Sequence, residues 1–388
     1  MSVVEFGEGC VMANRVRFLF ISALALFWSG AARADEQRLA TDGRVNGRPA
    51  RMVLDTGVSF PLAMPKRAMS KFGLAMDNGR SVDAAAANVI NGFSKPIKIE
   101  IAPAYVAQGA VFAILEDGPE TMNWDFDVAI GWPAMAGNQL HYSRRKQIIM
   151  FGKHIQLDTG GWATFPTLNS NVLVFDAGGK GGPLPVLIDT GWSGGIQLAP
   201  ELWKAWRAKN GARLHSFISF FSPGSGFQVK EQVFARRIQI GNATFSNVLV
   251  SEAPAHAAGG SIPPIATLGL EAFANHELLI DSPSNEVHIA PADAAIIPDY
   301  NRLGATFMPG TMDAKVASGS PAAAADVKDG DVLVAIDGFA PGDYAAKLAG
   351  RLPWEQPAGT AVTLTLDRAG QRIVRRVVLQ DFLDPIAG

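Results

Sequence analysis

Two aspartates stand in matching heptapeptides and could act as a pair. Residues 53–59 read Val-Leu-Asp-Thr-Gly-Val-Ser, and residues 187–193 read Leu-Ile-Asp-Thr-Gly-Trp-Ser. Average residue usage predicts about 0.1 Asp-Thr-Gly triplets in a chain of this length. We therefore interpret the two copies, which contain Asp55 and Asp189, as a repeat that carries the chemistry.

Two carboxyl groups in contact can hydrolyse an amide without a metal ion or a nucleophilic side chain. Like charges a few ångström apart cannot both ionise, so such a pair shares one proton. One group then takes a proton from water while the other gives a proton to the substrate carbonyl. We expect Asp55 and Asp189 to be these catalytic residues. The alternative, that each Asp only caps a turn, leaves the Ser that recurs in both copies unexplained.

The repeat continues beyond the heptapeptides. Asp55 and Asp189 are 134 positions apart, and the spacing suits one domain-sized unit used twice. Residues 129–132, Ala-Ile-Gly-Trp, are matched by residues 267–270, Thr-Leu-Gly-Leu, and residues 141–143 and 148–151 are matched by 279–282 and 287–289. We expect two lobes, residues 35–165 and 166–297, rich in short alternating strands.

These motifs resemble the aspartic proteases, both pepsin-like and retropepsin-like, over about residues 36–297. The signature of that family is two apolar residues before Asp-Thr-Gly and a later apolar-apolar-Gly. The resemblance implies a predominantly all-β, two-lobed fold with a pseudo-twofold axis, which brings one Asp from each lobe to a shared floor. It implies a peptide or unfolded-protein substrate and an aspartic endopeptidase activity that needs no cofactor and no metal.

The neighbours of each Asp are expected to support the site. A side chain at Gly57 or Gly191 would push the two loops apart. By resemblance, Thr56 and Thr190 should interlock the loops through hydroxyl-to-backbone hydrogen bonds. Ser59 and Ser193, also by resemblance, should each donate to the outer oxygen of their Asp.

Substrate-cleft residues can be proposed from the same alignment of the two halves. The variable positions, Val58 and Trp192, should line the subsites that flank the scissile bond. A cleft of this kind needs a cover that excludes water. Gly92-Phe93 and Gly226-Phe227 lie at equal distances after Asp55 and Asp189, so we expect two hairpin flaps, tipped around residues 91–93 and 224–227. This arrangement is closer to the retropepsins than to pepsin.

The chain changes character after Pro298. The segments 303–307, 316–322 and 327–338 resemble a PDZ domain of the bacterial protease-associated type, which we assign to residues 298–388. The resemblance implies that a C-terminal peptide ligand adds as a strand beside Leu303, Gly304, Ala305, Thr306 and Phe307. The family usually has Gly where Asp326 stands, and Asp tolerates the left-handed backbone angles needed there. A purely structural role for this domain is the alternative.

The N-terminal residues 1–34 have the pattern of a secretory signal peptide. Arg15 and Arg17 precede an apolar run, residues 18–28, and residues 32–34 give the small-x-small site that a signal peptidase needs. The single cysteine, Cys10, lies before the run, so the mature chain has no disulfide and no cysteine nucleophile. We expect a periplasmic or secreted protein with no membrane attachment after signal removal. A net charge of −2 offers no attraction for nucleic acid.

The sequence also contains patterns typical of other chemistries. Residues 191–195 satisfy the Gly-x-Ser-x-Gly pattern of serine hydrolases, with Ser193 as the nucleophile and Asp281 and His288 following in order. Lobe one lacks this pattern, and the alternating strands and helices of those enzymes are not evident. A third Asp-Thr-Gly, residues 158–160, lacks the preceding apolar strand and the following Ser, and we interpret it as the connection between lobes. The non-enzymatic alternative is a peptide-binding scaffold of the same fold without turnover.

Overall fold

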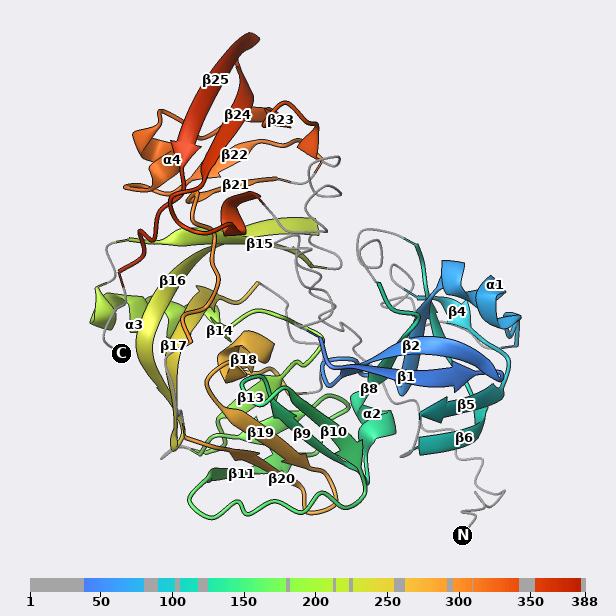
Figure 1. Cartoon of the computed structure of the whole chain (residues 1–388). Coiled ribbons are helices and arrows are strands. Elements are labelled where there is room, and N and C mark those ends of the chain that lie inside the picture. Colours follow the sequence, from blue (N-terminus) through green and yellow to red (C-terminus); the bar gives the residue numbers. More distant parts are fainter. Residues whose placement is uncertain are drawn as a thin grey trace.

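The structure is a computed structural model that describes residues 38–79, 90–101, 105–117, 125–178, 182–211, 214–222, 226–254, 262–291, 296–308, 310–341 and 353–384. The expected signal peptide, residues 1–34, lies outside these ranges. The described chain is predominantly β and is arranged in several sheets, as expected. Figure 1 shows one group of strands in blue and cyan, a second in green to light orange, and a third in dark orange to red.

The first group is an eight-stranded sheet with the order β4-β7-β3-β8-β2-β1-β5-β6. Its strands are β1 (Ala40–Val45), β2 (Arg48–Asp55), β3 (Leu62–Pro65), β4 (Ile90–Phe93), β5 (Ile97–Ile101), β6 (Tyr105–Ala110), β7 (Ala113–Leu115) and β8 (Val128–Gly131). The short helices η1 (Lys66–Ala68), α1 (Met69–Phe72) and α2 (Trp132–Met135) accompany it. Central strands β3 and β8 are apolar along their whole length because both faces are covered.

The second group is a twelve-stranded sheet with the order β10-β9-β19-β20-β11-β12-β13-β18-β14-β17-β16-β15. Its strands are β9 (Gln139–Ser143), β10 (Ile148–Gly152), β11 (Ala163–Leu168), β12 (Val174–Asp176), β13 (Pro185–Ile188), β14 (Ile196–Leu198), β15 (Ser216–Ser222), β16 (Gly226–Ile240), β17 (Ala243–Glu252), β18 (Ala266–Leu268), β19 (Glu277–Asp281) and β20 (Glu286–Ile289). Helices α3 (Pro200–Asn210) and η2 (Leu270–Phe273) belong to this part. Helix α3 begins with a proline at its first turn and ends at Gly211 in the left-handed region, which is the usual asymmetry of helix ends.

The central strands of the two sheets are paired in the same way. β2 runs parallel to β8, β8 antiparallel to β3, and β3 parallel to β7. In the second sheet β13 runs parallel to β18, β18 antiparallel to β14, and β14 parallel to β17. The repeat found in the sequence therefore corresponds to one strand arrangement formed twice.

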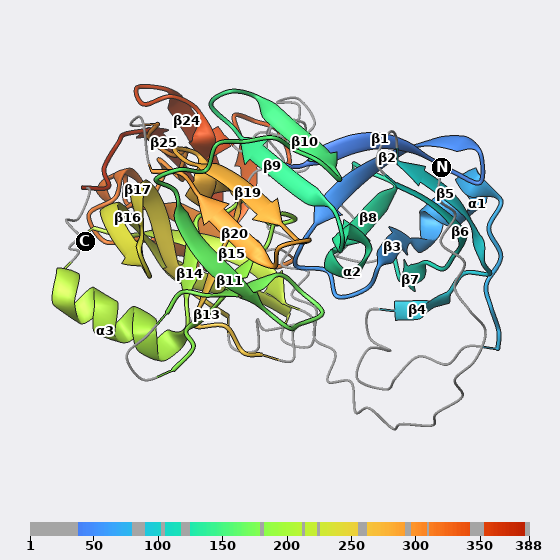
Figure 2. The ribbon, with the colours of Figure 1, turned by 90° about the horizontal axis from the view of Figure 1, so that it is seen from below.

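Matched strands of the two repeats also pair with each other. β9 lies antiparallel to β19, with His141 opposite Leu279 and Tyr142 opposite Leu278, while β10 and β20 flank the pair. Figure 2 shows β9 beside β19. Residues 139–152 thus belong to the second sheet, while the division into lobes at residues 165 and 166 stays a prediction. One continuous hydrophobic cluster, from Leu39 to Ile289, includes residues of both sheets.

The C-terminal part has its own core. It contains β21 (Ala305–Phe307), β22 (Ala314–Val316), α4 (Pro321–Ala324), β23 (Val332–Ile336), η3 (Pro353–Glu355), β24 (Ala361–Arg368) and β25 (Gln371–Val378). A separate apolar cluster runs from Leu303 to Leu379. Asp326 has a φ of 59°, which is the left-handed angle expected at this position.

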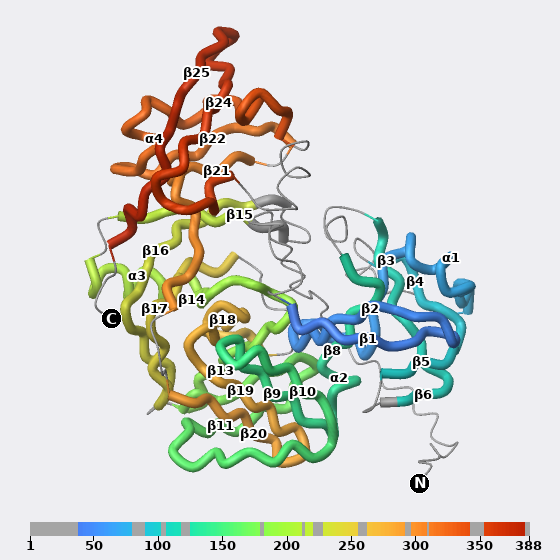
Figure 3. The backbone as a smooth tube through the Cα atoms, viewed as in Figure 1, coloured from blue at the N-terminus to red at the C-terminus, as the bar shows by residue number. Residues whose placement is uncertain are grey.

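This part is attached to the second sheet. Phe382 and Leu383 pack with Tyr300 against Phe234 of β16 and Leu249 of β17. β21 lies beside β15, as the tube in Figure 3 makes visible. In the ranges given above, no helix is both long and apolar enough to cross a membrane.

Candidate active site

The structure brings Asp55 and Asp189 together between the two sheets. Asp55 is the last residue of β2, and Asp189 directly follows β13. The two side chains are 8% and 4% exposed and hydrogen-bond to each other. A Cβ atom on Gly57 would lie 2.6 Å from Cγ of Asp189, and one on Gly191 would lie 2.0 Å from Oδ2 of Asp55. Each carboxyl group thus rests against the glycine of the opposite loop.

Two later glycines hold these loops in place. The N–H of Gly131 donates to Pro61 O, and the N–H of Gly269 donates to Gly195 O, both at 2.9 Å. A Cβ atom on Gly131 would lie 1.9 Å from Phe60 O, and one on Gly269 would lie 2.3 Å from Gly194 O. The apolar-apolar-Gly segments of the repeat therefore support the two aspartate loops at a distance that only glycine allows.

Thr56 and Thr190 interlock beneath the carboxyl groups. The N–H of Thr56 donates to Oγ1 of Thr190 at 3.0 Å, and the N–H of Thr190 donates to Oγ1 of Thr56 at 3.1 Å. The Thr56 hydroxyl donates to Ile188 O at 2.6 Å, and the Thr190 hydroxyl donates to Leu54 O at 2.7 Å. Both residues are fully buried. The hydroxyl-to-backbone bonds expected from the family resemblance are therefore present in both directions.

Backbone donors surround the two carboxyl groups. Oδ1 of Asp55 accepts from the N–H of Gly57 at 3.0 Å, and Oδ1 of Asp189 accepts from Gly191 and Trp192 at 3.1 and 3.2 Å. Ser59 is buried in its loop and Ser193 is half-buried. The bonds expected from these two hydroxyls to the carboxyl groups stay a prediction.

Burial sets the protonation of the pair. Burial raises the pKa of Asp55 to about 6, against the lowering effect of the Gly57 N–H. Burial, with the negative charge of Asp55 as the second cause, raises the pKa of Asp189 well above its usual range. The two carboxyls act on each other, so they titrate as a pair, and the pair keeps a proton to higher pH than a free aspartate does.

Arg38 lies beside this pair, and sequence analysis missed it. Its guanidinium donates to Oδ1 of Asp125 at 3.0 Å and stands 5.1 Å from the centre of the Phe126 ring. The positive charge of Arg38 lowers the pKa of Asp55, against the dominant effect of burial. β1 pairs with β2 so that Val45 faces Arg48 and Ala40 faces Val53, and the N–H of Leu54 donates to Leu39 O at 2.9 Å, so Arg38 lies at the end of the strand pair where Asp55 stands.

A signal for Arg38 exists in the sequence. Asn46-Gly47 is the strongest short hairpin signal, and both residues have positive φ angles of 51° and 77°. Such a two-residue turn fixes the register of the strands on either side. Val45 and Arg48 flank this turn. Arg38 precedes Val45 by the same number of positions as Asp55 follows Arg48, so the register of the hairpin predicts that the two residues are neighbours.

The two variable positions are buried. Val58 is 1% exposed and packs in a cluster with Phe60 and Phe93, while Trp192 is 2% exposed. The Trp192 ring lies against Gly194, where an added Cβ would come within 2.2 Å of it. Their expected role as subsite residues stays a prediction.

The flap residues fall in two different settings. Gly92 and Phe93 were expected at a hairpin tip. They lie instead within β4, where they pair with Ile114 and Ala113 of β7. The Phe93 ring packs against Phe60 at 6.3 Å, and this contact fixes the segment to the sheet. Residues 80–89, which precede β4, lie outside the described ranges.

In the second half the expected hairpin is present. β15 and β16 pair antiparallel up to Ser222 opposite Gly226, so Gly226 and Phe227 begin the returning strand. Residues 224 and 225 of the expected tip lie outside the described ranges. Because β15 also lies beside β21, the C-terminal part contacts this hairpin.

The third Asp-Thr-Gly and the histidine of the serine-hydrolase pattern have other partners. Asp158 is exposed and accepts only a local bond from the Gly160 N–H at 2.9 Å among the bonds described. The ring nitrogens of His288 lie 3.0 Å from Oγ1 of Thr164 and 3.3 Å from Oε2 of Glu286. The histidine that a serine mechanism would need is therefore engaged by Thr164 and Glu286.

The C-terminal candidate residues form one strand and the loop before it. Gly304 has a φ of 70°, and Ala305–Phe307 pairs with β22. The N–H groups of Leu303 and Gly304 both donate to Oδ1 of Asn301 at 3.0 Å, while Nδ2 of Asn301 donates to Ala305 O at 2.7 Å. Asn301 thus occupies backbone donors at the place where a ligand carboxylate was expected, and the ligand role of residues 303–307, including Thr306, stays a prediction.

Comparison with known proteins does not assign the chain to a family. No protein-family model matches the chain, and no curated protein matches its sequence. Within the described part of the chain, no group of three or more His, Cys, Asp or Glu side chains could hold a metal ion.

Proposed function

We propose that the chain is a periplasmic or secreted aspartic-type endopeptidase of the retropepsin-like kind, with a C-terminal PDZ domain. One observation carries the proposal: the carboxyl groups of Asp55 and Asp189, from two repeats of one strand arrangement, hydrogen-bond to each other above the Thr56–Thr190 interlock. The substrate is a peptide or an unfolded protein.

The first step is attack by water. A water molecule held between the carboxyls loses a proton to ionised Asp55 while its oxygen attacks the scissile carbonyl carbon, and Asp189 gives its proton to the carbonyl oxygen. The product is a neutral gem-diol. The backbone N–H groups of Gly57, Gly191 and Trp192 hold the carboxyls in position for this exchange.

The second step breaks the C–N bond. Asp55 gives its proton to the leaving amine nitrogen, and one hydroxyl of the gem-diol returns a proton to Asp189 as the new carboxylic acid forms. The pair ends as it began, with one proton, so the cycle requires no further reactant.

The test compares three carboxylates in one assay. The mature chain, beginning at residue 35, is incubated with an unfolded protein near neutral pH, and cleavage products are identified by mass. Asp55→Asn and Asp189→Asn should each reduce turnover by about 10³-fold, the range for losing a general acid or base. The matched control is Asp158→Asn, in the exposed third Asp-Thr-Gly, which should retain full activity. A statine-type analogue should inhibit the wild-type chain.

The same assay distinguishes the alternatives. A chain that binds the statine-type analogue but produces no cleavage, at any pH from acidic to neutral, would be the peptide-binding scaffold. Turnover lost in Ser193→Ala with an ester substrate and retained in Asp55→Asn would instead support the serine hydrolase.

A further inference from the structure

A pocket lies in the described part of the chain, and its lining does not include the aspartate pair. It has a volume of about 510 Å³ and lies between helix α3 and the strands β14, β16 and β17 of the second sheet. This volume is within the range of about 300–1,000 Å³ typical of small-molecule sites. Neither Asp55 nor Asp189 contributes to its lining.

Large apolar side chains form one part of the lining of this pocket. Leu198, Leu202 and Trp206 line it from β14 and α3, and Leu184 and Ile265 line it from the segments that precede β13 and β18. Leu184 and Leu202 are among the exposed large apolar side chains of the protein. Placing a hydrocarbon chain against these side chains would remove apolar surface from water on both partners.

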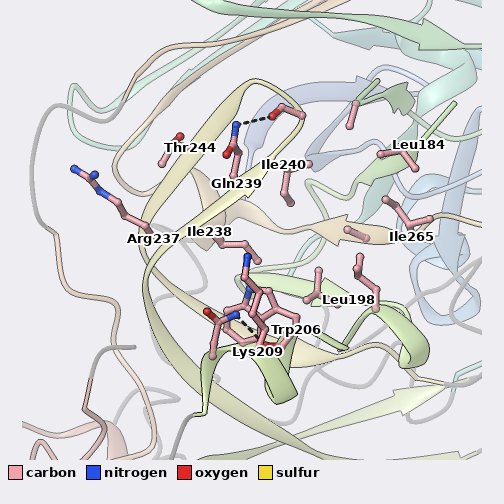
Figure 4. A pocket seen from close by; sticks show the side chains of 15 residues that line it. Leu184, Leu198, Trp206, Lys209, Arg237, Ile238, Gln239, Ile240, Thr244 and Ile265 are labelled. Carbon is pink, nitrogen blue, oxygen red and sulfur yellow. Dashed lines mark hydrogen bonds between the residues drawn. The ribbon is translucent and has the colours of Figure 1, made fainter. Parts of the chain in front are cut away.

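The polar side of the pocket is cationic. Its charged lining residues are Lys209 and Arg237, and no Asp or Glu belongs to the lining. Neither cation has an ion-pair partner among the residues that the structure describes. Figure 4 shows Lys209 near Trp206, with Leu184 and Ile265 on the opposite side of the pocket and the Arg237 side chain extending outward at its rim. In a chain of net charge −2, this local excess of positive charge favours an anionic group at one end of an apolar ligand.

The strands around the pocket offer no edge for an extended peptide. β14, β16, β17 and β18 each have a neighbouring strand on both sides in the twelve-stranded sheet. Peptides that bind by strand addition need an unpaired strand edge. The ligand must therefore be recognised by side chains alone, and a flexible hydrocarbon chain meets that condition.

We propose that this pocket binds a long-chain fatty acid, with its hydrocarbon chain among Leu184, Leu198, Leu202 and Ile265 and its carboxylate on the side of Lys209 and Arg237. The carboxylate is ionised at neutral pH and would gain a cationic partner. The site is separate from the proposed peptidase chemistry and does not depend on it.

The experiment measures binding by the full mature chain after lipid removal. Hexadecanoic acid and hexadecan-1-ol, both below their aggregation limits, displace a fluorescent fatty acid from the protein. The acid should bind in one-to-one stoichiometry and more tightly than the alcohol. Lys209→Met should weaken the acid about fivefold, as expected for one partly exposed charge pair, and leave the alcohol unchanged.

The controls use the same helix. Lys204→Met removes an exposed cation of α3 that is not part of the lining and should not alter binding of either ligand. Leu202→Asp, at an exposed position, should weaken both ligands, and its thermal unfolding verifies that the variant is folded. No binding, binding unaffected by Lys209→Met, or competition only from a peptide with an apolar C-terminus would overturn the proposal.

Discussion

The hydroxyl oxygens of Thr56 and Thr190 lie 3.4 Å apart, and each donates its proton to a backbone carbonyl of the other repeat. Each also accepts the N–H of the other threonine. Four hydrogen bonds thus join the two aspartate loops in a fully buried place, where unsatisfied polar groups are costly. The position of the carboxyl groups relative to each other depends on this junction.

Thr56→Val tests the junction. The substitution keeps the shape but leaves the Thr190 N–H and the Ile188 carbonyl without their partner, so we expect a loss of about 2–4 kcal/mol in the free energy of unfolding. Peptidase activity should fall as well. Urea unfolding at neutral pH measures the loss. Thr56→Ser retains the hydroxyl and should lose less than half as much; equal losses in the two variants would contradict this account.

The pH dependence of activity follows from the pKa values of the pair. Because burial raises the pKa of Asp55 to about 6 and that of Asp189 higher still, both carboxyls are protonated at low pH. As the pH rises through about 6, the carboxyl pair loses one of its two protons and reaches the singly protonated form. We expect turnover to increase through this range and to be greater at neutral pH than at about pH 4. A profile of kcat with its maximum below about pH 5 would show that this assignment is wrong.

Arg38→Gln should move that profile. The positive charge of Arg38 lowers the pKa of Asp55, so its removal should raise this pKa and shift the acidic limb of the activity profile to higher pH. Arg38→Lys keeps the charge and should shift the limb less. Arg51→Gln is the control, since Arg51 also pairs with Asp125, at 3.5 Å, but does not act on the pKa of Asp55. Identical shifts in the Arg38 and Arg51 variants would assign the effect to Asp125.

Asp55→Asn should stabilise the fold at neutral to alkaline pH. A folded-state pKa raised from 3.8 to about 6 means that the folded chain binds this proton more tightly than the unfolded chain. The stability it provides is present at low pH and is lost as the pH rises through about 6. A shift of about two pKa units corresponds to about 3 kcal/mol. Thermal unfolding of both chains at about pH 8 should reveal the gain, and the gain should vanish below about pH 3.

Gly191→Ala tests the contact between each carboxyl and the opposite loop. The added methyl would lie 2.0 Å from Oδ2 of Asp55, so the loops must separate and activity should be lost. Gly160→Ala is the matched control, because the same triplet there is exposed and an added Cβ would lie 3.0 Å from Oδ1 of Asp158. A cleavage assay on both variants decides the matter. Retention of activity in Gly191→Ala would mean that the carboxyls need not lie close together.

The two aspartates at the centre of the candidate site could be selected from the sequence because repetition is visible without a structure. Asp55 and Asp189 were found as one pattern in two places, and the threonine interlock followed from the resemblance to a known family. The predominantly β fold followed from short alternating strands. The third Asp-Thr-Gly was separated from the others because a turn without a buried strand before it stays at the surface.

Features that depend on strand register were harder to predict. Arg38 reaches Asp55 only through the pairing of β1 with β2, which requires counting outward from the turn at Asn46 and Gly47. Gly92 and Phe93 were expected at a flap tip from equal spacing alone, but the apolar contact of Phe93 with Phe60 keeps them in β4. Two segments that follow their aspartates at the same distance in the sequence need not occupy the same place in the fold, because the residues between can pack differently in the two repeats.

The pairing of β9 with β19 has a consequence for biosynthesis. These are matched strands of the two repeats, so the residues 139–143 emerge from the ribosome with their hydrogen-bonding partner, residues 277–281, still unsynthesised. Until residues 277–281 are synthesised, β9 has an unpaired edge, which β19 occupies in the complete chain. A fragment ending near residue 152 would offer that edge to a second fragment, and two such fragments could join where the intact chain closes upon itself.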